Sequence, residues 1–401
     1  MTTKTTGGAL AGFKVIDMTR VLGGPYCTQI LADHGAEVIK VEPPQGDETR
    51  DWGPPFRDQT ASYYLGVNRN KRTIALDFTK AAGQAVLLRL LKHADVLIHN
   101  FKWGTLEKWG LGYEAVLQPR FPRLIYCHIS GFGGDGPHGG RPGYDAVVQA
   151  MCGLMGVNGT PETGPLRLGT PMVDLGAGLN AVIGILLAAH ERQRSGRGQS
   201  VEVTLYDSGV ALLHPQAANW FMSDRTPQPI GNAHPNVSPY DQFATATRPI
   251  FLAVGNDRQF GWLCAELAAP ELADDPRFRD NAGRVTNRDA LRQALVALLA
   301  EHDGQALADR LLARGVPAGA VLTVPEVMNH PHSAVREMVV EDGAYRGTGI
   351  PIKFGRTGTA TASAPRRFGA DGRAILAEAG YGADEIEALA EAGILVERRR
   401  R

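Results

Sequence analysis

The carboxylate of Asp174 stands at a point in the sequence where it could take part in chemistry. It follows the run Pro171–Val173 and precedes an apolar stretch, Leu175–Ala189. A carboxylate at the start of a helix can act as a nucleophile that forms covalent intermediates, and the helix N-terminus stabilises the anion. Gly176 and Gly178 would let a bulky acyl group or thioester approach the backbone there. The residue types therefore allow a reactive anion at Asp174.

Asp174 also has a purely structural interpretation. Asp is among the best N-cap residues, and a cap typically stabilises a helix by about 1 kcal/mol relative to Ala. Spacing alone favours this capping role over a catalytic one. Because a capping carboxylate can also be a nucleophile, the two interpretations are compatible, and other parts of the chain must decide between them.

A glycine-rich segment, Gly131–Gly143, follows a predicted strand and contains the pattern G-x-G-x-x-G at Gly131, Gly133 and Gly136. In a dinucleotide-binding fold this pattern opens directly into a helix whose N-terminus meets the pyrophosphate. Pro137 and the Gly and Pro residues after it exclude a helix for several residues here. The sequence therefore argues against a Rossmann-type dehydrogenase and favours a mobile loop over a site.

Missing motifs and cysteine spacing disfavour several other enzyme classes. The sequence has no G-x-S-x-G elbow, no H-E-x-x-H and no Walker loop, which disfavours a serine hydrolase, a zinc protease and a nucleoside triphosphatase. The four cysteines lie far apart without a C-x-x-C pair, so we expect no zinc site and no disulfide framework. This pattern suits a reducing cytosol. His128, on a predicted buried strand, is expected to be a core histidine.

Length and composition are those of an ordinary globular protein. The 401 residues suffice for roughly two to three domains, and 43% of them are hydrophobic and 21% charged. Forty-two basic residues balance 42 acidic ones, which gives no support to nucleic-acid or membrane-surface binding. The charge cluster Arg398–Arg401 is expected to be a solvated tail. The N-terminus lacks a secretory signal and Leu175–Ala189 is too short to span a bilayer, so we expect a cytoplasmic protein.

The first half of the chain alternates short apolar strands with amphipathic helices. This alternation predicts an α/β fold with a parallel sheet covered on both faces. Helices are expected from Pro25 to about His34 and over Lys80–Lys92, with Thr79 as a candidate N-cap. The predicted strands are Lys14–Met18, Ala36–Glu42, Thr73–Asp77, Asp95–His99 and Leu124–Ser130.

The second half predicts another helix and a change of domain. Leu179, Val182, Ile183 and Leu186 have the spacing of a core-facing helix. Residues 200–214 read as a strand and the start of a helix, and a segment rich in Pro, Asn and Ser that begins near Phe221 reads as a linker. We therefore expect a large domain over residues 1–220, a linker over 221–235, a small α+β domain over 236–324 and a return of 325–401 to the large domain.

Seven stretches spread over nearly the whole chain carry a family resemblance. They are "KVIDMTRVLGGPYCTQILADHGAEVIKVEPPQGD", "NRNKRTIALD", "ADVLIHNFKWGTLEKWGLGYE", "RPGYDAVVQAMCGLM", "GTPMVDLGAGL", "GVPAGAVLTVPEVMNHP" and "GYGADEIEALAEAGIL". Each stretch alone is a weak signal, but their order and spacing together are specific. The sequence resembles the class III CoA-transferases, a family typified by formyl-CoA:oxalate and carnitine CoA-transferases.

This resemblance implies a fold and a mechanism. Family members have a large Rossmann-like domain and a small domain joined by two linkers, and two chains interlock like rings into a homodimer. In the family an Asp attacks an acyl-CoA thioester, a mixed anhydride forms, and the returning CoA thiolate gives an aspartyl-CoA thioester. The acceptor carboxylate then repeats the sequence in reverse. This Asp corresponds to Asp174, so the resemblance implies an acyl-CoA and a carboxylic acid as substrates, with no tightly bound cofactor and no metal.

The resemblance also assigns site residues position by position. Tyr144 matches an active-site Tyr, and Asp145 stands where some members have a catalytic Glu. Lys108 replaces a common Arg, which keeps a cation for phosphate but loses the bidentate fork. A basic contact of the family is absent at Pro142, and Arg141 is the candidate substitute. The matched CoA-binding positions are Leu22, Gly23, Leu76, Thr79, Asn100, Phe101, Lys102, Lys108 and Arg141.

Two alternative functions are weighed against CoA transfer. The superfamily also contains 2-methylacyl-CoA racemases, in which a His is the second base beside the Asp. Tyr144 takes that His position, and Tyr, with a pKa near 10, is a poor base at neutral pH, so CoA transfer is favoured. A non-catalytic CoA-binding scaffold is disfavoured by the retained Asp174.

The acceptor acid is the least determined part of this expectation. Arg20, Arg69 and Arg141 are the cationic residues that could bind a second carboxylate. The stretches "GYDAVVQAMCGLM" and "GNAHPNVSPYDQF" are similar to members that use dicarboxylates such as succinate or glutarate. The second stretch aligns with a loop that covers the intermediate in the formyl enzyme, but it lacks that loop's glycine run.

Overall fold

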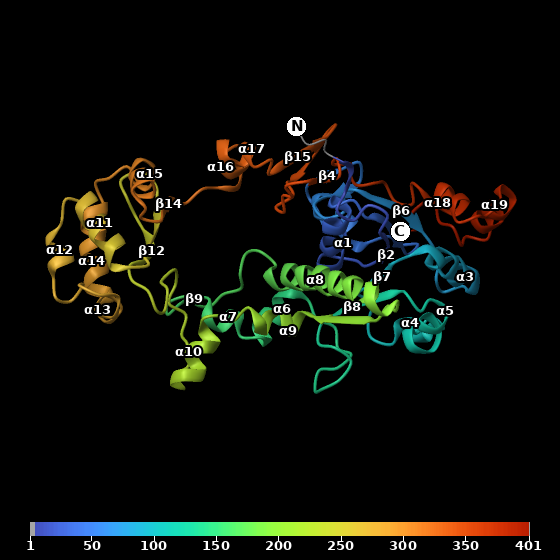
Figure 1. The fold of residues 1–401 in the computed structure, drawn as a ribbon, viewed down its shortest axis with the longest axis horizontal. Coiled ribbons are helices and arrows are strands. Elements are labelled where there is room, and N and C mark those ends of the chain that lie inside the picture. Colours follow the sequence, from blue (N-terminus) through green and yellow to red (C-terminus); the bar gives the residue numbers. More distant parts are fainter. Residues whose placement is uncertain (1–4, 401) are drawn as a thin grey trace. The chain divides into compact units, whose positions relative to one another are not determined.

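In the computed structural model, which describes residues 5–400, the apolar strands of the first half assemble into a six-stranded parallel sheet (Figure 1). The strand order is β11-β8-β7-β2-β3-β6, and every neighbouring pair is parallel. The predicted strands are confirmed to within two residues at their ends. The strands are β2 Lys14–Met18, β3 Glu37–Glu42, β6 Lys71–Ala75, β7 Val96–His99, β8 Ile125–Ser130 and β11 Ser200–Thr204.

Each face of this sheet buries its own hydrophobic core. Because side chains alternate along a strand, Val15 of β2 joins one core and Ile16 and Met18 join the other. Helices α1 and α8, which lie side by side in Figure 1, supply the first core, and α3, α18 and α19 supply the second. The α/β prediction with both faces covered is confirmed. These helices are α1 Gly23–Asp33, α8 Met172–Ser195, α3 Ala81–Leu90, α18 Gly372–Glu378 and α19 Ala383–Glu391.

Thr79 does not cap the helix that follows it. The N-cap of α3 is Lys80, without a side-chain hydrogen bond. The Thr79 hydroxyl donates instead to Oδ1 of Asp77 (2.5 Å), which also accepts the Thr79 N–H (3.2 Å). The candidate capping role is wrong because the Thr79 hydroxyl is hydrogen-bonded to Asp77 in a local turn after β6.

Helix α8 buries alanine, glycine and β-branched residues and exposes several leucines. Leu179, Ile183 and Leu186 are 40–55% exposed, so the predicted core-facing stripe is wrong for all its members except Val182. The close approach of α8 to α1 explains this inversion, because only small side chains leave room for it. The buried positions are Val173, Ala177, Gly178, Ala181, Val182, Ile185 and Ala188.

By length and composition alone, α8 is the one described helix that could cross a membrane. It extends beyond the stretch Leu175–Ala189 that we judged too short, so that argument from length fails. Core helices of soluble proteins meet the same criterion, and the buried side chains of α8 belong to the first core of the sheet. The criterion therefore adds little evidence for a membrane location.

The C-terminal part of the chain lies at the edge of the sheet beside β6. There, Val396 N–H donates to the Ala75 carbonyl oxygen (2.9 Å), and Leu395 pairs with Leu76 in an antiparallel bridge. The charge cluster at this end does not form a free tail. Arg399 forms an ion pair with Asp51, and Arg400 forms one with Asp77. The expectation of a solvated tail is wrong for these two arginines, and Arg401 lies outside the described residues.

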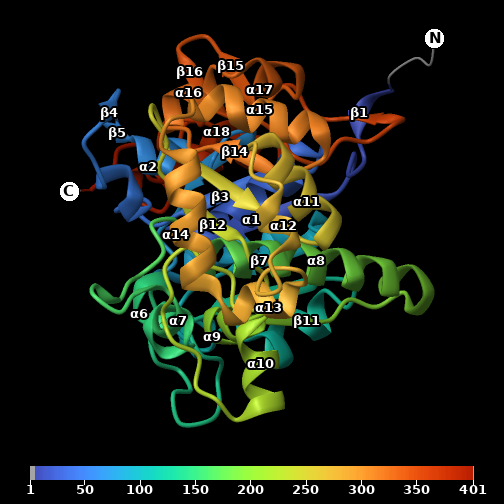
Figure 2. The same ribbon diagram turned by 90° about the vertical axis from the view of Figure 1, so that its left-hand side faces the viewer.

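A smaller unit has its own sheet and core. It consists of Met155–Arg167 and His214–His330, and the rest of the chain forms the large unit. The expected small domain, residues 236–324, lies inside this unit, and the expected linker begins within α10, Gln216–Ser223. Figure 2 shows the helices of this unit around its antiparallel strands. Its main elements are β12 Tyr240–Phe243, β13 Ile250–Ala253, β14 Ala318–Ala320, α11 Asp257–Glu266, α14 Arg288–Leu299 and α15 Gly304–Arg314.

Shorter elements complete both units. Helices α6 Asp145–Met151 and α9 Leu205–Ala211 accompany α8 in the large unit, and α2 Ser62–Leu65 follows β5. The remaining elements are β1 Thr5–Gly8, β4 Phe56–Arg57, β5 Thr60–Ala61, α4 Thr105–Lys108, α5 Gln118–Arg120, α7 Leu154–Val157, β9 Gly159–Thr160, β10 Gly164–Pro165, α12 Glu271–Asp274, α13 Asn281–Thr286, α16 Val324–Met328, α17 Pro331–Val335, β15 Val339–Asp342, β16 Tyr345–Thr348, β17 Thr357–Gly358, the 3₁₀ helices Glu48–Asp51 and Leu91–His93, and a π-helical turn, Tyr113–Leu117.

Candidate functional site

Asp174 lies in the first turn of α8 and not at its cap. The helix begins at Met172, and its N-cap residue, Pro171, provides no side-chain hydrogen bond. Instead, Oδ2 of Asp145 accepts hydrogen bonds from the N–H groups of Val173 (2.9 Å) and Asp174 (3.1 Å). The capping role considered for Asp174 is therefore wrong, because a carboxylate from α6 fills it. The carboxylate of Asp174 is left for another task.

Asp145 is itself held in place by a buried glutamine. Gln149, one turn later on α6, donates from Nε2 to Oδ1 of Asp145 (2.6 Å), and its Oε1 accepts the N–H of Leu168 (2.9 Å). Both oxygens of Asp145 are thus bonded within the protein, and only 8% of the residue is exposed. Asp145 is well placed to orient the start of α8. Its i, i+4 spacing from Gln149 is the sequence signal that could have predicted this pair.

The surroundings of Asp174 bring its ionisation close to neutral pH. Burial, and after it the negative charge of Asp145, raise the pKa of Asp174 to about 7. The carboxyl group is then about half ionised at pH 7. Such a carboxylate is a better nucleophile or base than one with an ordinary pKa, while a useful fraction of it remains charged.

Tyr63, on α2, lies near Asp174 and is absent from the residues predicted for the site. Burial and the charges of Asp174, Asp145 and Asp47 raise the pKa of Tyr63 to about 12. Its ring packs edge-on against that of Trp52, with 5.2 Å between centroids. A phenol in this state keeps its proton at neutral pH and can donate a hydrogen bond. The sequence gives no signal for this placement, because Tyr63 and Asp174 meet only through the tertiary fold.

The N-terminus of α1 meets the first turn of α8 at Asp174. A Cβ on Gly23 would lie 3.0 Å from the carbonyl oxygen of Asp174, and a Cβ on Gly178 would lie 2.7 Å from that of Gly23. Side chains at these positions would push the two helices apart. A Cβ on Gly176 would meet Cδ1 of Leu212 at 3.3 Å. The expectation that Gly176 and Gly178 admit an acyl group is therefore wrong, because protein atoms occupy the space beside them.

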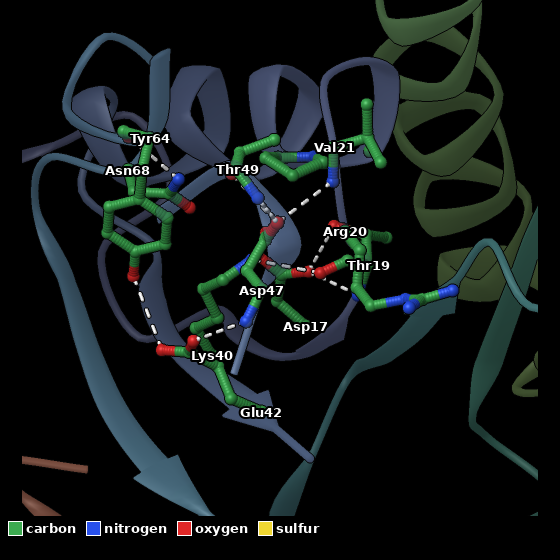
Figure 3. Close-up of polar contacts among 12 residues, drawn as sticks. Asp17, Thr19, Arg20, Val21, Lys40, Glu42, Asp47, Thr49, Tyr64 and Asn68 are labelled. Carbon is green, nitrogen blue, oxygen red and sulfur yellow. Dashed lines mark hydrogen bonds and ion pairs between the residues drawn. The ribbon is translucent and has the colours of Figure 1, made fainter. Parts of the chain in front are cut away.

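Buried side chains hold the turn that leads from β2 into α1 (Figure 3). Val21 has a left-handed backbone, with φ at 68°, which is rare for a β-branched residue and marks a strained turn. Its N–H donates to Oδ1 of Asp47 (3.3 Å). The Lys40 ammonium group donates both to Oδ2 of Asp47 (3.0 Å) and to the carbonyl oxygen of Thr19 (2.9 Å). This cluster fixes the backbone that approaches Asp174.

Asn100 holds the same turn from the end of β7. Its Oδ1 accepts the N–H of Arg20 (2.9 Å), and its Nδ2 donates to the carbonyl oxygen of Arg20 (2.7 Å). The side-chain amide is therefore bonded to the protein on both sides. The resemblance places Asn100 among the CoA contacts, and in the structure its side chain shapes the wall of that region.

A narrow cavity of about 160 Å³ has Asp174 in its lining and brings most of the expected site residues together. The glycine-rich loop also lines it through Gly131, Gly133, Gly140 and Gly143, so this loop does border the site. His128, behind it, bonds the carbonyl oxygen of Phe101 (2.9 Å) and is the expected core histidine. The expected residues in the lining are Leu22, Gly23, Asn100, Phe101, Lys102, Arg141, Tyr144 and Asp174.

A wide cavity of about 1360 Å³ shares part of its lining with the narrow one. The shared residues are Arg20, Glu48, Phe101 and Lys102. Aromatic rings form one wall, where Trp109 stacks on Phe78 with 5.8 Å between centroids. The other lining residues include Pro43, Pro44, Gln45, Gly46, Asp51, Phe56, Gln59, Asp77, Thr79, Thr105, Arg399 and Arg400.

Two of the expected CoA-binding residues line neither cavity. Leu76 is completely buried in the second core of the sheet, and Lys108 lies on the exposed side of α4. Thr79 does line the wide cavity, although its hydroxyl is bonded to Asp77. Among residues 5–400, no group of three His, Cys, Asp or Glu side chains is placed to hold a metal ion.

Comparison with known sequences covers most of the chain. Residues 10–372 match the family model described as CoA-transferase family III. The chain is 40% identical to an acetyl-CoA:oxalate CoA-transferase of Acetobacter aceti, over 86% of this chain and 89% of that one. It is 41% identical to a succinate–glutarate CoA-transferase of Agrobacterium fabrum, over 85% of this chain and 87% of that one. A mouse succinyl-CoA:glutarate CoA-transferase is 36% identical, over 96% of this chain and 90% of that one.

Comparison with solved structures agrees with the sequence comparison. A CaiB/BaiF family protein of Brucella suis superimposes with a TM-score of 0.84 and is 40% identical, covering 93% of this chain and all of that one. A Mycobacterium tuberculosis protein superimposes with a TM-score of 0.82 at 32% identity, covering 92% of this chain and all of that one. The fold described above is therefore also the fold of experimentally determined relatives.

Proposed function

The chain belongs to CoA-transferase family III, and from this premise we propose that Asp174 carries the acyl group, and then CoA, between a CoA thioester and a free dicarboxylic acid. CoA transfer from an acyl-CoA to a carboxylic acid is its enzymatic activity. The observation that carries the proposal is the state of Asp174. Its carboxylate lines the narrow cavity, is released from helix capping, and has a pKa of about 7.

The proposed reaction uses Asp174 twice, first as an acyl carrier and then as a CoA carrier. An oxygen of Asp174 attacks the thioester carbonyl carbon, the carbon–sulfur bond breaks, and a mixed anhydride and CoA thiolate form. The thiolate attacks the aspartyl carbonyl, which releases the donor acid and leaves an aspartyl-CoA thioester. The acceptor carboxylate then attacks the carbonyl carbon of this thioester, the carbon–sulfur bond breaks, and a new anhydride and CoA thiolate form. The thiolate attacks its acceptor-side carbonyl, which yields the new acyl-CoA and restores the carboxylate of Asp174.

The two cavities suit the two ends of the CoA molecule. The narrow cavity leads to Asp174 and would take the thioester end of the pantetheine arm. The wide cavity has the volume and the aromatic lining that a nucleotide requires, with the partly buried Trp109 available for contact with the base and the buried Phe78 stacked behind it. Lys102 lines both cavities and can place a cation near the phosphates. CoA therefore enters as a substrate, and the proposal involves no tightly bound cofactor.

A dicarboxylate is the proposed acceptor because the relatives are named for succinate, glutarate and oxalate. Of the three arginines considered from the sequence, Arg69 is already bonded to the Asp33 carboxylate (2.6 and 2.8 Å) and to the carbonyl oxygen of Thr348 (2.6 Å). Arg20 and Arg141 line the narrow cavity instead. These two side chains are therefore the proposed ligands for the second carboxylate of the acceptor.

We also propose a cytoplasmic homodimer, the interlocked assembly that the family resemblance implies. The exposed stripe of α8 supports an assembly, because Leu179, Ile183 and Leu187 place large apolar surfaces in contact with water in the single chain. All four cysteines are buried and unpaired, which suits a reducing compartment.

Covalent capture tests the role of Asp174. After incubation with succinyl-CoA, the intact mass of the protein should rise by that of CoA less one water, and peptide mapping should place the adduct on Asp174. Asp174→Ala should abolish the adduct and lower the transfer rate by at least about a thousandfold, since the covalent carrier is gone.

The matched control is Asp289→Ala, because Asp289 also lies in the first turn of a helix but belongs to the small unit. This variant should keep both the adduct and the activity. An adduct that survives in Asp174→Ala would refute the assignment. Exchange of the α-proton of the substrate with solvent, without CoA transfer, would point to the racemase alternative.

A further inference from the structure

Two arginines near the end of the chain line the wide cavity. Arg399 and Arg400 belong to a cluster of like charges that, from sequence alone, reads as a solvated tail, yet both are part of the cavity wall. The neighbouring Arg398 is exposed and lies outside this lining. The two arginines come from the far end of the chain, whereas the other residues in the lining lie between Arg20 and Trp109.

The backbone, and not only the side chains, fixes this segment against the cavity. Val396 N–H donates to the carbonyl oxygen of Ala75 (2.9 Å), and Arg400 N–H donates to that of Pro44 (2.9 Å). Pro44 itself lines the wide cavity. The two hydrogen bonds place the arginines at the cavity independently of what their guanidinium groups contact.

Neighbouring carboxylates occupy only part of each guanidinium group. Arg399 contacts Oδ1 of Asp51 through its Nη2, and Arg400 approaches Oδ2 of Asp77 through its Nη1 (3.5 Å) and donates from Nη2 to the carbonyl oxygen of Gly393 (3.1 Å). A guanidinium group has five N–H donors, so donors remain on both side chains. The carboxylates orient the arginines and leave hydrogen-bonding capacity for a ligand.

The charges of the wall favour an anionic ligand that bears several charges. Four cations, Arg20, Lys102, Arg399 and Arg400, face three carboxylates, those of Glu48, Asp51 and Asp77. Lys102 forms no ion pair within residues 5–400. Arginine matches phosphate oxygens in a bidentate manner and is the side chain of choice for phosphate recognition.

Resting on the CoA-transferase function proposed above, we propose that Arg399 and Arg400 bind phosphate groups at the nucleotide end of CoA. The aromatic wall of Phe78 and Trp109 lines the same cavity and would contact the base. The C-terminal segment thereby completes a binding site whose other residues come from the first third of the chain. It would also favour CoA over carriers that lack the nucleotide.

Calorimetric titration of the full chain tests this assignment. The probes are CoA and 3′-dephospho-CoA, and the variants are Arg399→Gln, Arg400→Gln, their combination and the matched control Arg398→Gln. We expect each single substitution to weaken CoA binding about tenfold and the double variant to weaken it more, while the control stays within twofold of wild type. If 3′-dephospho-CoA shows the same loss, the arginines bind the diphosphate. If it shows little loss, they bind the 3′-phosphate.

Two results would overturn the assignment. One is a double variant that binds both probes as tightly as wild type. The other is a loss equal to that of the Arg398→Gln control. Thermal unfolding checks that the variants are folded, and if the double variant is not, Arg400→Gln carries the test because its backbone tie to Pro44 does not involve the guanidinium group. Wild-type protein that fails to bind CoA would contradict the proposed function itself, whereas tight binding by wild type and variants alike would contradict only this inference.

Discussion

At the scale of single residues, two carboxylates share the start of α8, and only one of them is left for chemistry. Asp145 accepts hydrogen bonds from Val173, Asp174 and Gln149, so both of its oxygens are bonded within the protein. Asp174 lies partly buried beside that charge, and its pKa rises to about 7. Burial is the larger cause of this rise, and the cost of a second anion beside the first adds to it. Asp145 thus helps to set the pKa of the carboxylate that we propose as the nucleophile.

Asp145→Asn should move the pH dependence of the reaction. The Asn side chain keeps an oxygen for the two N–H groups of α8 but removes the negative charge, so the pKa of Asp174 should fall. The wild-type rate, expressed as kcat/KM, should rise with pH through about 7, because only the ionised carboxylate attacks and about a tenth of it is ionised at pH 6.

In the Asp145→Asn variant the rising limb should lie at lower pH, and its plateau should be lower because a less basic carboxylate is a weaker nucleophile. A pH–rate profile between pH 5 and 9 measures both effects. A limb that stays in place in this variant would mean that Asp174 does not set it.

Part of this residue-scale picture could be predicted from the sequence. Asp174 is recognisable from its position before an apolar helix and from the motif around it. The sequence does not show that Asp174 leaves the cap to another residue, because Asp145 reaches the helix from another element. Tyr63 could not be predicted for the same reason, because neither the charge nor the hydrophobic periodicity of its segment identifies it as a site residue. Sequence spacing describes neighbours on one helix or strand, and this site is built from several.

At the scale of elements, the contact between α1 and α8 sets the geometry of the site. Because the glycines at this contact have no side chains, the two backbones come close together and the first turns of both helices approach Asp174. This close approach also explains why α8 buries alanines and exposes leucines. The strands, in contrast, were predictable, because a parallel sheet covered on both faces gives short continuous apolar runs with clear ends.

Gly178→Ala should reduce activity strongly. The new Cβ would lie 2.7 Å from the carbonyl oxygen of Gly23, which is backbone and can only move with α1. We expect a cost of about 1–3 kcal/mol from overpacking, partly offset by up to about 1 kcal/mol of helix propensity, and a loss of kcat of tenfold or more as the turn shifts away from Asp174.

Gly176→Ala is the matched control on the same helix. Its Cβ would meet only the end of the flexible Leu212 side chain at 3.3 Å, so kcat should stay close to wild type and the unfolding free energy should stay the same or rise by up to about 1 kcal/mol. Urea titration and steady-state kinetics compare the two variants. Equal effects of both substitutions would show that the α1–α8 contact does not control the site.

At the scale of the whole molecule, the fold of a single chain does not explain why α8 exposes an apolar stripe. Ile183 is 55% exposed and Leu187 64% exposed, on a helix whose buried face carries small residues. Apolar residues on two faces are typical of a helix that packs between two partners. The periodicity of Leu179 and Ile183 did reveal an apolar stripe, but a sequence does not state which surface covers it.

Light scattering should therefore find a mass of twice 43.0 kDa for the wild-type protein. The double substitution Ile183→Glu and Leu187→Glu should produce monomers, because it places two charges in a desolvated contact, at a cost of several kcal/mol. Val296→Glu is the control, since Val296 is also partly exposed on a helix but belongs to the small unit. Wild-type protein that remains at 43.0 kDa at micromolar concentration would remove the case for a dimer.

Long-range connections were the least predictable part of the molecule. The return of the C-terminus to the large unit could be predicted, but the placement of Arg399 and Arg400 at a cavity could not. Their charges alone suggest exposure to solvent, but the backbone hydrogen bonds from Val396 to Ala75 and from Arg400 to Pro44 place them beside Asp51 and Asp77. Such contacts depend on two distant segments at once, so neither segment carries the signal alone.

The contact between α1 and α8 also bears on which groups are negatively charged at successive stages of the proposed reaction. Both helices direct their N-terminal turns, and so the positive ends of their dipoles, toward the same carboxylate. In the proposed reaction, acylation removes the charge of Asp174, and the unchanged field would act on the CoA thiolate that has just departed. A fixed arrangement of peptide groups would then serve two successive anions without any rearrangement between them.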